Sequence, residues 1–317
     1  MPRRLRYIRK GGSLVEITNR TVHARYLLRP DRAGELEEII LGVVGRAQRL
    51  HDVTLHGLTF LSNHAHILGF FEDARQMASF MNVVNGELGR EIARFADWPD
   101  KVWARRYVSI PVSDEPAAQI SRLRYLLANS VKENLVERAD QWPGVHSVGA
   151  LRDGEVLKGL WFDRSAECEA KRRGESYAHD EFATEEIVEL SPLPCREHLS
   201  PKEHRAWVAG LVEEIETEAA VDREESGKRV LGVAKIYAQD PHHRPDKPKR
   251  SPAPAFHAAS KQAFDHLRAT YAWVVQVFRE AADRLREGDR TVVFPEGTFP
   301  SSLPFVPFST FARGHPP

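Results

Sequence analysis

The order in which two hydrophobic periods alternate along the first 140 residues constrains the fold more than any other feature of this sequence. Strand-like segments, rich in apolar residues and bounded by turn residues, lie at Leu14–Thr18, 53–61, 66–71 and 103–112. Segments with apolar residues at helical spacing run from about 34 to 50, from 74 to 95 and from 114 to 138, the last with an acidic start and an early proline. We therefore predict the order β-α-β-β-α-β followed by one more helix. This is an α+β fold of the ferredoxin-like type, in which helices cover one face of an antiparallel sheet.

The second half of the chain has a different pattern. Residues 140–200 are polar and show no clean period, whereas helical spacing returns at about 201–225 and 257–286, with a proline-rich stretch between these two helices. The tail VVFPEGTFPSSLPFVPF is extended and apolar, so we expect it to pack onto the rest of the protein. The predicted organisation is a first domain over 1–150 and an accessory, mainly helical region over 151–317. This accessory region would bind the same ligand as the first domain, form an oligomer interface or cover the first domain.

Composition and cysteine content favour a soluble protein of a reducing compartment. Apolar residues make up 42% of the chain and charged residues 28%, the balance of an ordinary globular protein. No apolar run is long enough to span a bilayer, and the basic N-terminus MPRRLRYIRK is not followed by the apolar region of a secretory signal. The two cysteines, Cys168 and Cys195, build no disulfide framework. We therefore expect a cytoplasmic protein with no membrane partner.

A net charge of zero hides an uneven distribution of charge. Residues 1–150 carry 21 Lys and Arg against 17 Asp and Glu, and the second half compensates this excess. Basic residues are concentrated in an N-terminal arm formed by Arg3, Arg4, Arg6, Arg9 and Lys10. A second basic stretch over 228–250 offers Lys228, Arg229, Arg244, Lys247, Lys249 and Arg250. Such clusters suit phosphate contact, although for either one alone a solvated surface is the commoner explanation.

Two histidines stand two residues apart at the start of a predicted strand. In a strand, residues two apart point to the same face, so His64 and His66 would present their imidazoles side by side. Two neutral imidazoles held by a strand form half of a divalent-metal site. The alternative is a pair of histidines at a sheet edge, each hydrogen-bonded to water. A second pair, His242-His243, lies in the proline-rich stretch, and we interpret it as a solvated loop pair.

A tyrosine and an asparagine share one side of the predicted third helix. Ile120, Leu123 and Leu127 form the apolar stripe that we expect to face the sheet. Tyr125 lies roughly 200° around the helix from Leu123 and Leu127, at about 100° per residue. Asn129 follows one turn later on the same side as Tyr125, and Lys132 lies beyond it. Taken alone, this pattern also fits a surface tyrosine.

Four motifs in order resemble those of the single-tyrosine HUH transposases, and most closely those of the REP-associated tyrosine transposases. VEITNR (15–20) is similar to that family's first strand, and SNHAHIL (62–68) is similar to its P-N-H-x-H strand. WARRY (103–107) resembles the fourth strand, and RYLLANSVKENLV (124–136) resembles the tyrosine helix R-Y-I-x-x-N-P-V-x-x-x-L-V; Trp142-Pro143 resembles the aromatic segment that follows. The resemblance covers about 140 residues of this chain. It departs from the family at Ser130, where proline is usual, and it does not cover the second half.

The resemblance implies a site and a chemistry. Tyr125 would attack a DNA phosphodiester and form a covalent 5′-phosphotyrosine, while His64, His66 and Asn129 would hold Mg²⁺ or Mn²⁺. The implied substrate is single-stranded DNA, next to a hairpin such as a palindromic repeat, and a homodimer is possible by family analogy. Candidate contacts to the DNA backbone are Arg3, Arg4, Arg6, Arg105, Arg106, Arg124 and Lys132, and candidates for base stacking are Trp103, Tyr107 and Trp142.

Three other functions remain open from the sequence. A domesticated hairpin-binding protein would share the fold without strand transfer, but it has no need for His64, His66 and Tyr125 together. A nickase of replication or plasmid transfer shares the histidine pair, although the segment around Tyr125 resembles the transposases more. A zinc hydrolase would want a carboxylate or a third histidine near the pair, and the local sequence offers none.

Overall fold

The sheet has the predicted ferredoxin-like order. The computed structural model describes residues 4–178, 180–245 and 254–299. Four strands, β1 (Ser13–Arg20), β2 (Thr54–Leu61), β3 (His64–Phe71) and β4 (Val108–Pro111), form one sheet in the order β2-β3-β1-β4. All three pairings are antiparallel, and β1 pairs with β3 along its whole length. The α+β prediction is therefore confirmed, with the strand that carries the two histidines in the interior of the sheet.

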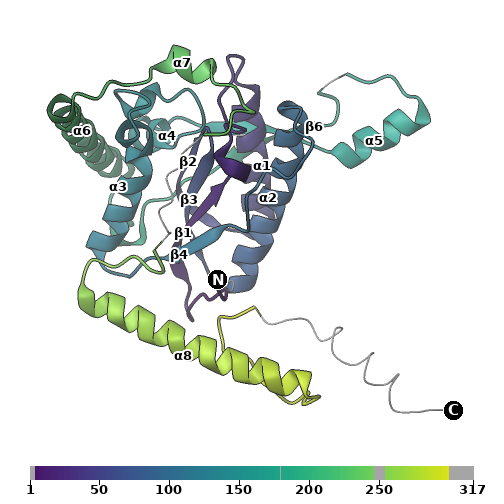
Figure 1. Cartoon of the computed structure of the whole chain (residues 1–317), viewed down its shortest axis with the longest axis vertical. Coiled ribbons are helices and arrows are strands. Elements are labelled where there is room, and N and C mark those ends of the chain that lie inside the picture. The colour runs from purple at the N-terminus through teal and green to yellow at the C-terminus, as the bar shows by residue number, and fades with distance from the viewer. Residues whose placement is uncertain (1–3, 179, 246–253, 300–317) are drawn as a thin grey trace.

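Helices cover both faces of this sheet, whereas the sequence predicted one covered face (Figure 1). The helices α1 (Glu35–His51) and α2 (Ala74–Phe95) pack on one face, over a core that includes Val15, Ile17 and Ile67. The helix α3 (Pro116–Lys132) packs on the other face, over Leu14 and Leu68. The difference arises because β1 and β3 carry apolar side chains on both of their faces, so each face needs a cover.

A glycine and a β-bulge in β2 allow α3 to approach the sheet closely. The pairing of β2 with β3 shifts register between Leu55 and Gly57, which leaves His56 as the extra residue of the bulge. A Cβ atom at Gly57 would lie 3.2 Å from Leu123 Cδ1 of α3. Thr59 of the same strand donates its hydroxyl hydrogen bond to the Leu126 carbonyl of α3 at 3.3 Å. The glycine thus fixes how near the tyrosine-bearing helix lies to the histidine-bearing strand.

The two largest differences from the predicted element boundaries lie at the fourth strand and at the third helix. The fourth strand is limited to Val108–Pro111, and the preceding segment joins the sheet only through an isolated bridge between Thr21 and Trp103. The third helix ends at Lys132 rather than near Arg138. Asn134 stands just past this end with φ of 54°, a left-handed conformation that an asparagine tolerates and that stops a helix.

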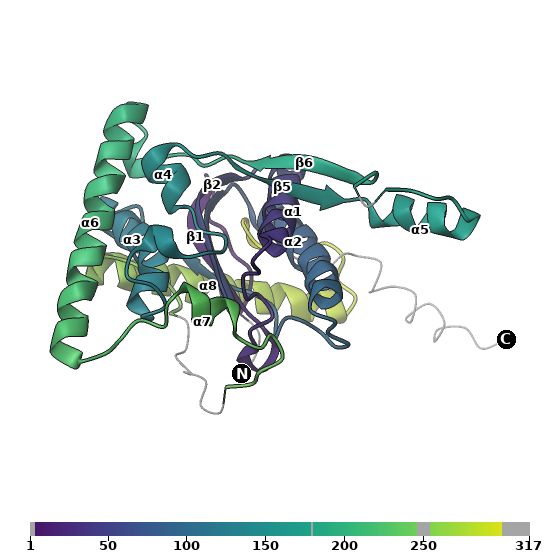
Figure 2. The same cartoon turned by 90° about the horizontal axis from the view of Figure 1, so that it is seen from above.

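A β-hairpin that the sequence did not reveal packs over α1. Its strands β5 (Leu157–Phe162) and β6 (Ala183–Val188) are antiparallel and both contact α1 (Figure 2). The helix α5 (Arg164–Arg173) follows β5 on an arm that projects from the body of the protein (Figures 1 and 2). Close approach of the hairpin to α1 requires Gly42, whose Cβ would clash with the backbone of β5.

The remaining helices bear out a mainly helical second half. The long helix α6 (Pro201–Ser226) starts with a capping box between Ser200 and Glu203 and packs on α3 and on the short helix α4 (Val148–Asp153). The helix α8 (Lys261–Arg286) lies along the N-terminal segment, where Tyr271 Oη donates to the Leu5 carbonyl at 3.2 Å. The short elements are α7 (Val233–Tyr237) and the 3-10 turns Val22–Ala24, Ala139–Gln141 and Pro194–Arg196.

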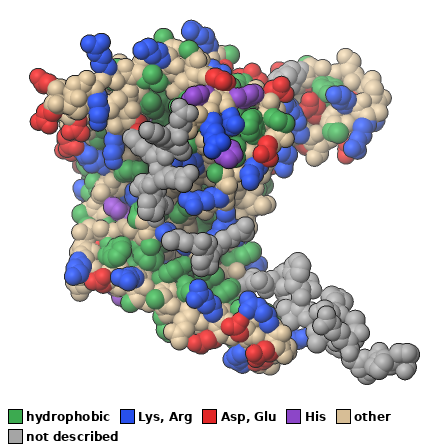
Figure 3. All heavy atoms as spheres, viewed as in Figure 1, with side chains coloured by type: hydrophobic (Ala, Val, Ile, Leu, Met, Phe, Trp, Pro, Cys, Tyr) green, Lys and Arg blue, Asp and Glu red, His purple; other side chains and the backbone are tan. Residues whose placement is uncertain are grey.

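Part of the apolar tail lies against the N-terminal arm, as the sequence predicted. Ile8 N–H donates to the Gly297 carbonyl at 2.9 Å, and Tyr7 forms a bridge with Thr298. The rest of the tail, from residue 300, lies outside the described residues. Charges of both signs are interspersed over the face shown in Figure 3. Within the described part of the chain, none of the helices has the length and apolar character of a membrane span.

Candidate active site

The structure brings the two histidines and the tyrosine together on the α3 side of the sheet. His64 and His66 point from β3 to the same face as Leu68, which packs under α3. Their ring centroids are 5.1 Å apart, and the His66 ring lies 5.6 Å from the ring of Tyr125 in an edge-to-face arrangement. Three side chains from two separate motifs therefore line one small region between β3 and α3.

Hydrogen bonds define which nitrogen of each imidazole is available for another ligand. His66 Nδ1 lies 2.7 Å from Glu16 Oε1, and because a carboxylate only accepts, Nδ1 carries the proton. His64 Nδ1 donates to Asn63 Oδ1 at 2.6 Å. In their neutral forms both rings therefore keep the Nε2 lone pair free of a proton, which is the form that binds a metal ion.

Electrostatics keeps His64 neutral. Desolvation by burial lowers the pKa of His64 well below its usual value, and the neighbouring His66 ring and the Arg20 guanidinium lower it further. A neutral imidazole is a ligand, whereas an imidazolium is not. The protonation state of His64 thus suits cation binding at neutral pH.

Glu16 and Arg122 belong to the site and were not identified from the sequence as site residues. Glu16 is fully buried in the middle of β1. Its second oxygen, Oε2, lies 3.1 Å from Arg122 Nε of α3. The sequence did hold a signal, because a charged residue interrupts the apolar run LVEI and a fully buried carboxylate needs partners.

Tyr125 is partly buried and its phenol is held between two cations. The Arg122 guanidinium carbon lies 4.8 Å from the centre of the tyrosine ring, and Lys132 Nζ lies 5.1 Å from it. Desolvation raises the pKa of Tyr125 above its usual value, and the nearby Glu16 carboxylate raises it further, against an opposing effect of Arg122. The phenol is therefore protonated at neutral pH in the protein alone.

Asn129 stands one turn after Tyr125 on α3 and is buried. Its amide nitrogen Nδ2 donates to the Leu126 carbonyl at 3.3 Å, so its Oδ1 is not needed for that bond. Among the described residues, no cluster of three His, Cys, Asp or Glu side chains could hold a metal ion. The site contains two imidazole rings, with the Glu16 carboxylate behind His66, and Asn129 lies one turn of α3 beyond Tyr125. Imidazole nitrogens suit zinc and nickel, whereas an amide oxygen suits Mg²⁺ or Mn²⁺, so these residue types fit a divalent cation without selecting one.

The predicted DNA contacts separate into different regions. Lys132 lies at the site, against the Tyr125 ring. Arg124 turns away from it and forms an ion pair with Glu218 of α6 at 2.6 Å. Arg3 lies outside the described residues, as do Lys247, Lys249 and Arg250.

Arg4, Arg6, Arg105 and Arg106 gather on another part of the surface, at the N-terminal arm and just before β4. Arg106 Nη2 donates to the Arg4 carbonyl at 2.6 Å, and Arg105 is exposed. Arg6 and Arg106 line an open groove of about 660 Å³ beside α2. The other lining residues are His51, Ala78, Ser79, Met81, Asn82, Val83, Asn85, Gly86, Tyr107 and Phe299. This lining carries cations, amides and two hydroxyls but no carboxylate, so it suits an anion such as a phosphodiester backbone.

Of the three aromatic residues proposed for base stacking, two are buried and one is partly buried. Trp142 is buried and donates its Nε1–H to the Phe60 carbonyl at 3.0 Å. Tyr107 is also buried, with the Arg6 guanidinium 5.6 Å from its ring centre. Trp103 is partly buried and donates to the Asn85 carbonyl at 3.0 Å.

A segment of the second half lies along the end of the histidine strand. Leu231 N–H donates to the Asn134 carbonyl just after α3, and Ser62 Oγ donates to Gln239 Oε1 at 2.6 Å, next to the β2–β3 turn. Farther along, His242 Nε2 lies 2.6 Å from the Ala96 carbonyl, while the His243 ring stacks on Tyr26. Both histidines are exposed and contact different partners, in agreement with the interpretation as a loop pair.

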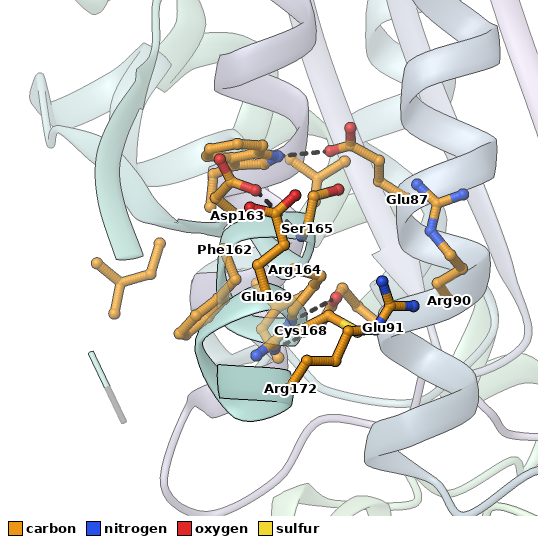
Figure 4. A pocket seen from close by; sticks show the side chains of 14 residues that line it. Glu87, Arg90, Glu91, Phe162, Asp163, Arg164, Ser165, Cys168, Glu169 and Arg172 are labelled. Atoms are coloured by element: carbon orange, nitrogen blue, oxygen red, sulfur yellow. Dashed lines mark hydrogen bonds and ion pairs between the residues drawn. The ribbon is translucent and has the colours of Figure 1, made fainter. Parts of the chain in front are cut away.

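A second cavity, of about 650 Å³, lies on the opposite side of the sheet between α1, α2, β5 and α5 (Figure 4). Two of its acidic side chains, Glu87 and Glu91, bind other residues that line the cavity. Trp161 Nε1–H donates to Glu87 at 2.6 Å, and Arg164 binds both oxygens of Glu91 at 2.9 and 2.6 Å. It contains neither the histidines nor Tyr125, so it is separate from the candidate site.

Comparison with known proteins finds similarity only among solved structures. No family model and no curated protein matches the chain. A REP-associated tyrosine transposase bound to a REP hairpin is 14% identical, with a TM-score of 0.34 over 46% of this chain and 82% of that one. A provisionally assigned transposase from Deinococcus radiodurans R1 is 16% identical, with a TM-score of 0.28 over 39% of this chain and 95% of that one.

Proposed function

We propose that this protein is a metal-dependent DNA strand transferase that cleaves and rejoins single-stranded DNA through a covalent phosphotyrosine. The observation that carries the proposal is the convergence of His64, His66 and Tyr125 between β3 and α3. The motif resemblance to the single-tyrosine HUH transposases supports the same reading, because it assigns roles to these same three residues.

His64, His66 and Asn129 would hold Mg²⁺ or Mn²⁺. A divalent cation bound there would polarise the scissile phosphodiester and offset the negative charge that develops on it. The Nδ1 bonds of the two histidines to Asn63 and Glu16 keep their Nε2 atoms ready for this role.

Tyr125 would act as the nucleophile. Its phenolic oxygen forms a bond to phosphorus, and the bond from phosphorus to the 3′-oxygen of the upstream nucleotide breaks. The phenol loses its proton to water, and the departing 3′-oxygen gains one and leaves as a hydroxyl. A phosphotyrosine keeps the energy of the phosphodiester, so a 3′-hydroxyl of another strand can reverse the step and complete the transfer. The raised pKa of Tyr125 in the protein alone means that phenolate formation waits for cation and substrate.

The substrate proposed is single-stranded DNA beside a hairpin. Lys132 and Arg122 stand next to the Tyr125 ring, where the scissile phosphate would lie. The acid-free groove with Arg6 and Arg106 offers a second place for the phosphate backbone of the same DNA.

We further propose a catalytic domain over 1–150 with an accessory region over 151–317, cytoplasmic location, and a homodimer as the assembly.

Incubation of the protein with a labelled hairpin oligonucleotide and Mn²⁺ tests this function. We expect a covalent protein–DNA species that survives denaturation in the wild type and in the control Tyr177→Phe, which lies on the projecting arm. The species should be absent from Tyr125→Phe and from reactions with EDTA. An adduct in Tyr125→Phe would reject the assigned nucleophile. Hairpin binding without any adduct in the wild type would favour the alternative, a hairpin-binding protein without strand transfer.

A further inference from the structure

We propose that Glu16 and Arg122 form a positioning pair, which dictates the nitrogen of His66 that carries the proton and holds Tyr125 beside that ring. The inference rests on the proposed function, since it concerns the same site. It assigns a role to a buried ion pair that joins the first strand of the sheet to the tyrosine helix.

Each oxygen of the Glu16 carboxylate has its own partner. Oε1 accepts the Nδ1–H bond of His66 at 2.7 Å, and Oε2 forms an ion pair with Arg122 Nε at 3.1 Å that does not have the geometry of a hydrogen bond. Both partners of the Glu16 carboxylate are buried as well. The exposed fraction is 7% for the His66 side chain and 8% for the Arg122 side chain. The three groups therefore form one network from which water is largely excluded, and electrostatic interactions within it are strong.

Stability alone does not account for this pair. Across the sheet, Glu16 is paired with Leu68 and Ile110, both of them buried, so an apolar side chain would suit the same place. Replacing a buried ion pair with apolar residues is often neutral or even stabilising, because two charges no longer have to leave water. We attribute the presence of the charged pair to its effect on His66 and Tyr125.

The effect on His66 is the choice of tautomer. With a carboxylate at Nδ1, the proton of the neutral ring is placed on Nδ1 and the lone pair on Nε2. Without an acceptor there, the proton can occupy either nitrogen and the ring can rotate. Partners of this kind behind a metal-binding histidine typically contribute 10- to 100-fold in metal affinity.

The effect on Tyr125 comes through Arg122. The guanidinium that pairs with Glu16 also lies 4.8 Å from the centre of the Tyr125 ring, three residues later on α3. The pair thus couples three elements, β1 through Glu16, β3 through His66 and α3 through Arg122.

The test uses an apolar double variant, Glu16→Leu with Arg122→Met, which leaves no charge unpaired. A matched control is Glu91→Leu with Arg164→Met, because Glu91 is also a buried carboxylate that binds an arginine, far from the site. Mn²⁺ affinity is measured by titration calorimetry, and the His66 tautomer by ¹⁵N NMR of histidine-labelled protein, with His66→Gln to assign its signals. Circular dichroism establishes that each variant is folded.

We expect the Glu16/Arg122 variant to bind Mn²⁺ 10- to 100-fold more weakly than wild type and the control to stay within twofold. In the wild type, the ¹⁵N shifts of His66 should show protonated Nδ1 and unprotonated Nε2, and in the variant they should move toward a mixture. Unchanged tautomer and affinity within twofold of wild type would overturn the inference. If the double variant does not fold, Glu16→Gln takes its place and Glu16→Asp should restore part of the affinity.

The same experiments separate this inference from the proposed function. A protein–DNA adduct that persists in Tyr125→Phe would reject the proposed function. It would not affect the conclusion that the ¹⁵N shifts give on the His66 tautomer. If the wild type binds no Mn²⁺, the proposed metal dependence fails, and the ¹⁵N shifts alone decide whether Glu16 governs the His66 tautomer.

Discussion

The buried imidazole of His146 makes the stability of this protein depend on pH. His146 forms a bridge with Thr59 of β2, and its Nδ1 accepts a hydrogen bond from Val148 N–H at 3.2 Å. Desolvation lowers its pKa from 6.5 to about 4, and the backbone of Leu127 in α3 opposes the shift only in part. Protonation of His146 would therefore disturb the contact between β2 and the tyrosine helix.

The sign and size of the effect follow from linkage. Because the pKa of His146 is lower in the folded protein than in the unfolded chain, the unfolded chain takes up the proton first as the pH falls. The stabilisation is complete above about pH 6.5 and is lost as the pH falls toward about 4. Between pH 8 and pH 5 the loss is about 2 kcal/mol, at about 1.4 kcal/mol for each of roughly one and a half pKa units.

Urea unfolding of the wild type and of His146→Leu at pH 8 and pH 5 measures the contribution of His146 to the free energy of unfolding. At pH 8 we expect the variant to be less stable by about 1 kcal/mol, because Val148 N–H loses its acceptor. Between pH 8 and pH 5 the wild type should lose about 2 kcal/mol more than the variant. Desolvation lowers the pKa values of His56, His204 and His257 as well, but their contributions are common to both proteins and cancel. Equal losses in the two proteins would refute the reasoning.

Three further predictions concern the helix contact, the groove and the third ligand. Gly57→Val should push α3 from β2, because a Cβ there already lies 3.2 Å from Leu123, and urea unfolding should show a loss of about 1–3 kcal/mol. Arg6→Ala or Arg106→Ala should lower the slope of log affinity against log salt for a hairpin by about 1, and an unchanged slope would remove the groove from the DNA path. Asn129→Ala should weaken Mn²⁺ binding in calorimetry, and wild-type affinity in this variant would exclude the amide as a ligand.

The sheet could be predicted because its pattern is local. Each strand and each of the first three helices carries its own hydrophobic period, and β-α-β-β-α-β order leaves few arrangements open. The convergence of His64 and Tyr125 followed only from the motif resemblance, because helical spacing placed Tyr125 away from the apolar stripe that was expected to face the sheet. What spacing does not contain is the side of the sheet on which α3 packs, because apolar residues on both faces of β1 allow either choice.

The hairpin β5–β6 escaped prediction for a different reason. It gains its stability from contact with α1, where Gly42 and Gly159 remove side chains that would hold the two backbones apart. The two segments lie more than 100 residues apart in the sequence. Their close packing therefore produces no hydrophobic periodicity in either segment that would predict it. The role of Glu16 was hidden in a similar way, because its partners His66 and Arg122 come from distant parts of the chain.

The central claim, that a cation held by His64 and His66 lies beside Tyr125, can be tested with ¹⁹F NMR of fluorotyrosine-labelled protein. Of the seven tyrosine signals, titration with Mn²⁺ should broaden that of Tyr125 first, because a paramagnetic ion acts most strongly on the nearest ring. The broadening should disappear in His64→Ala with His66→Ala. Broadening of other tyrosines ahead of Tyr125, or its persistence without the two histidines, would contradict the account.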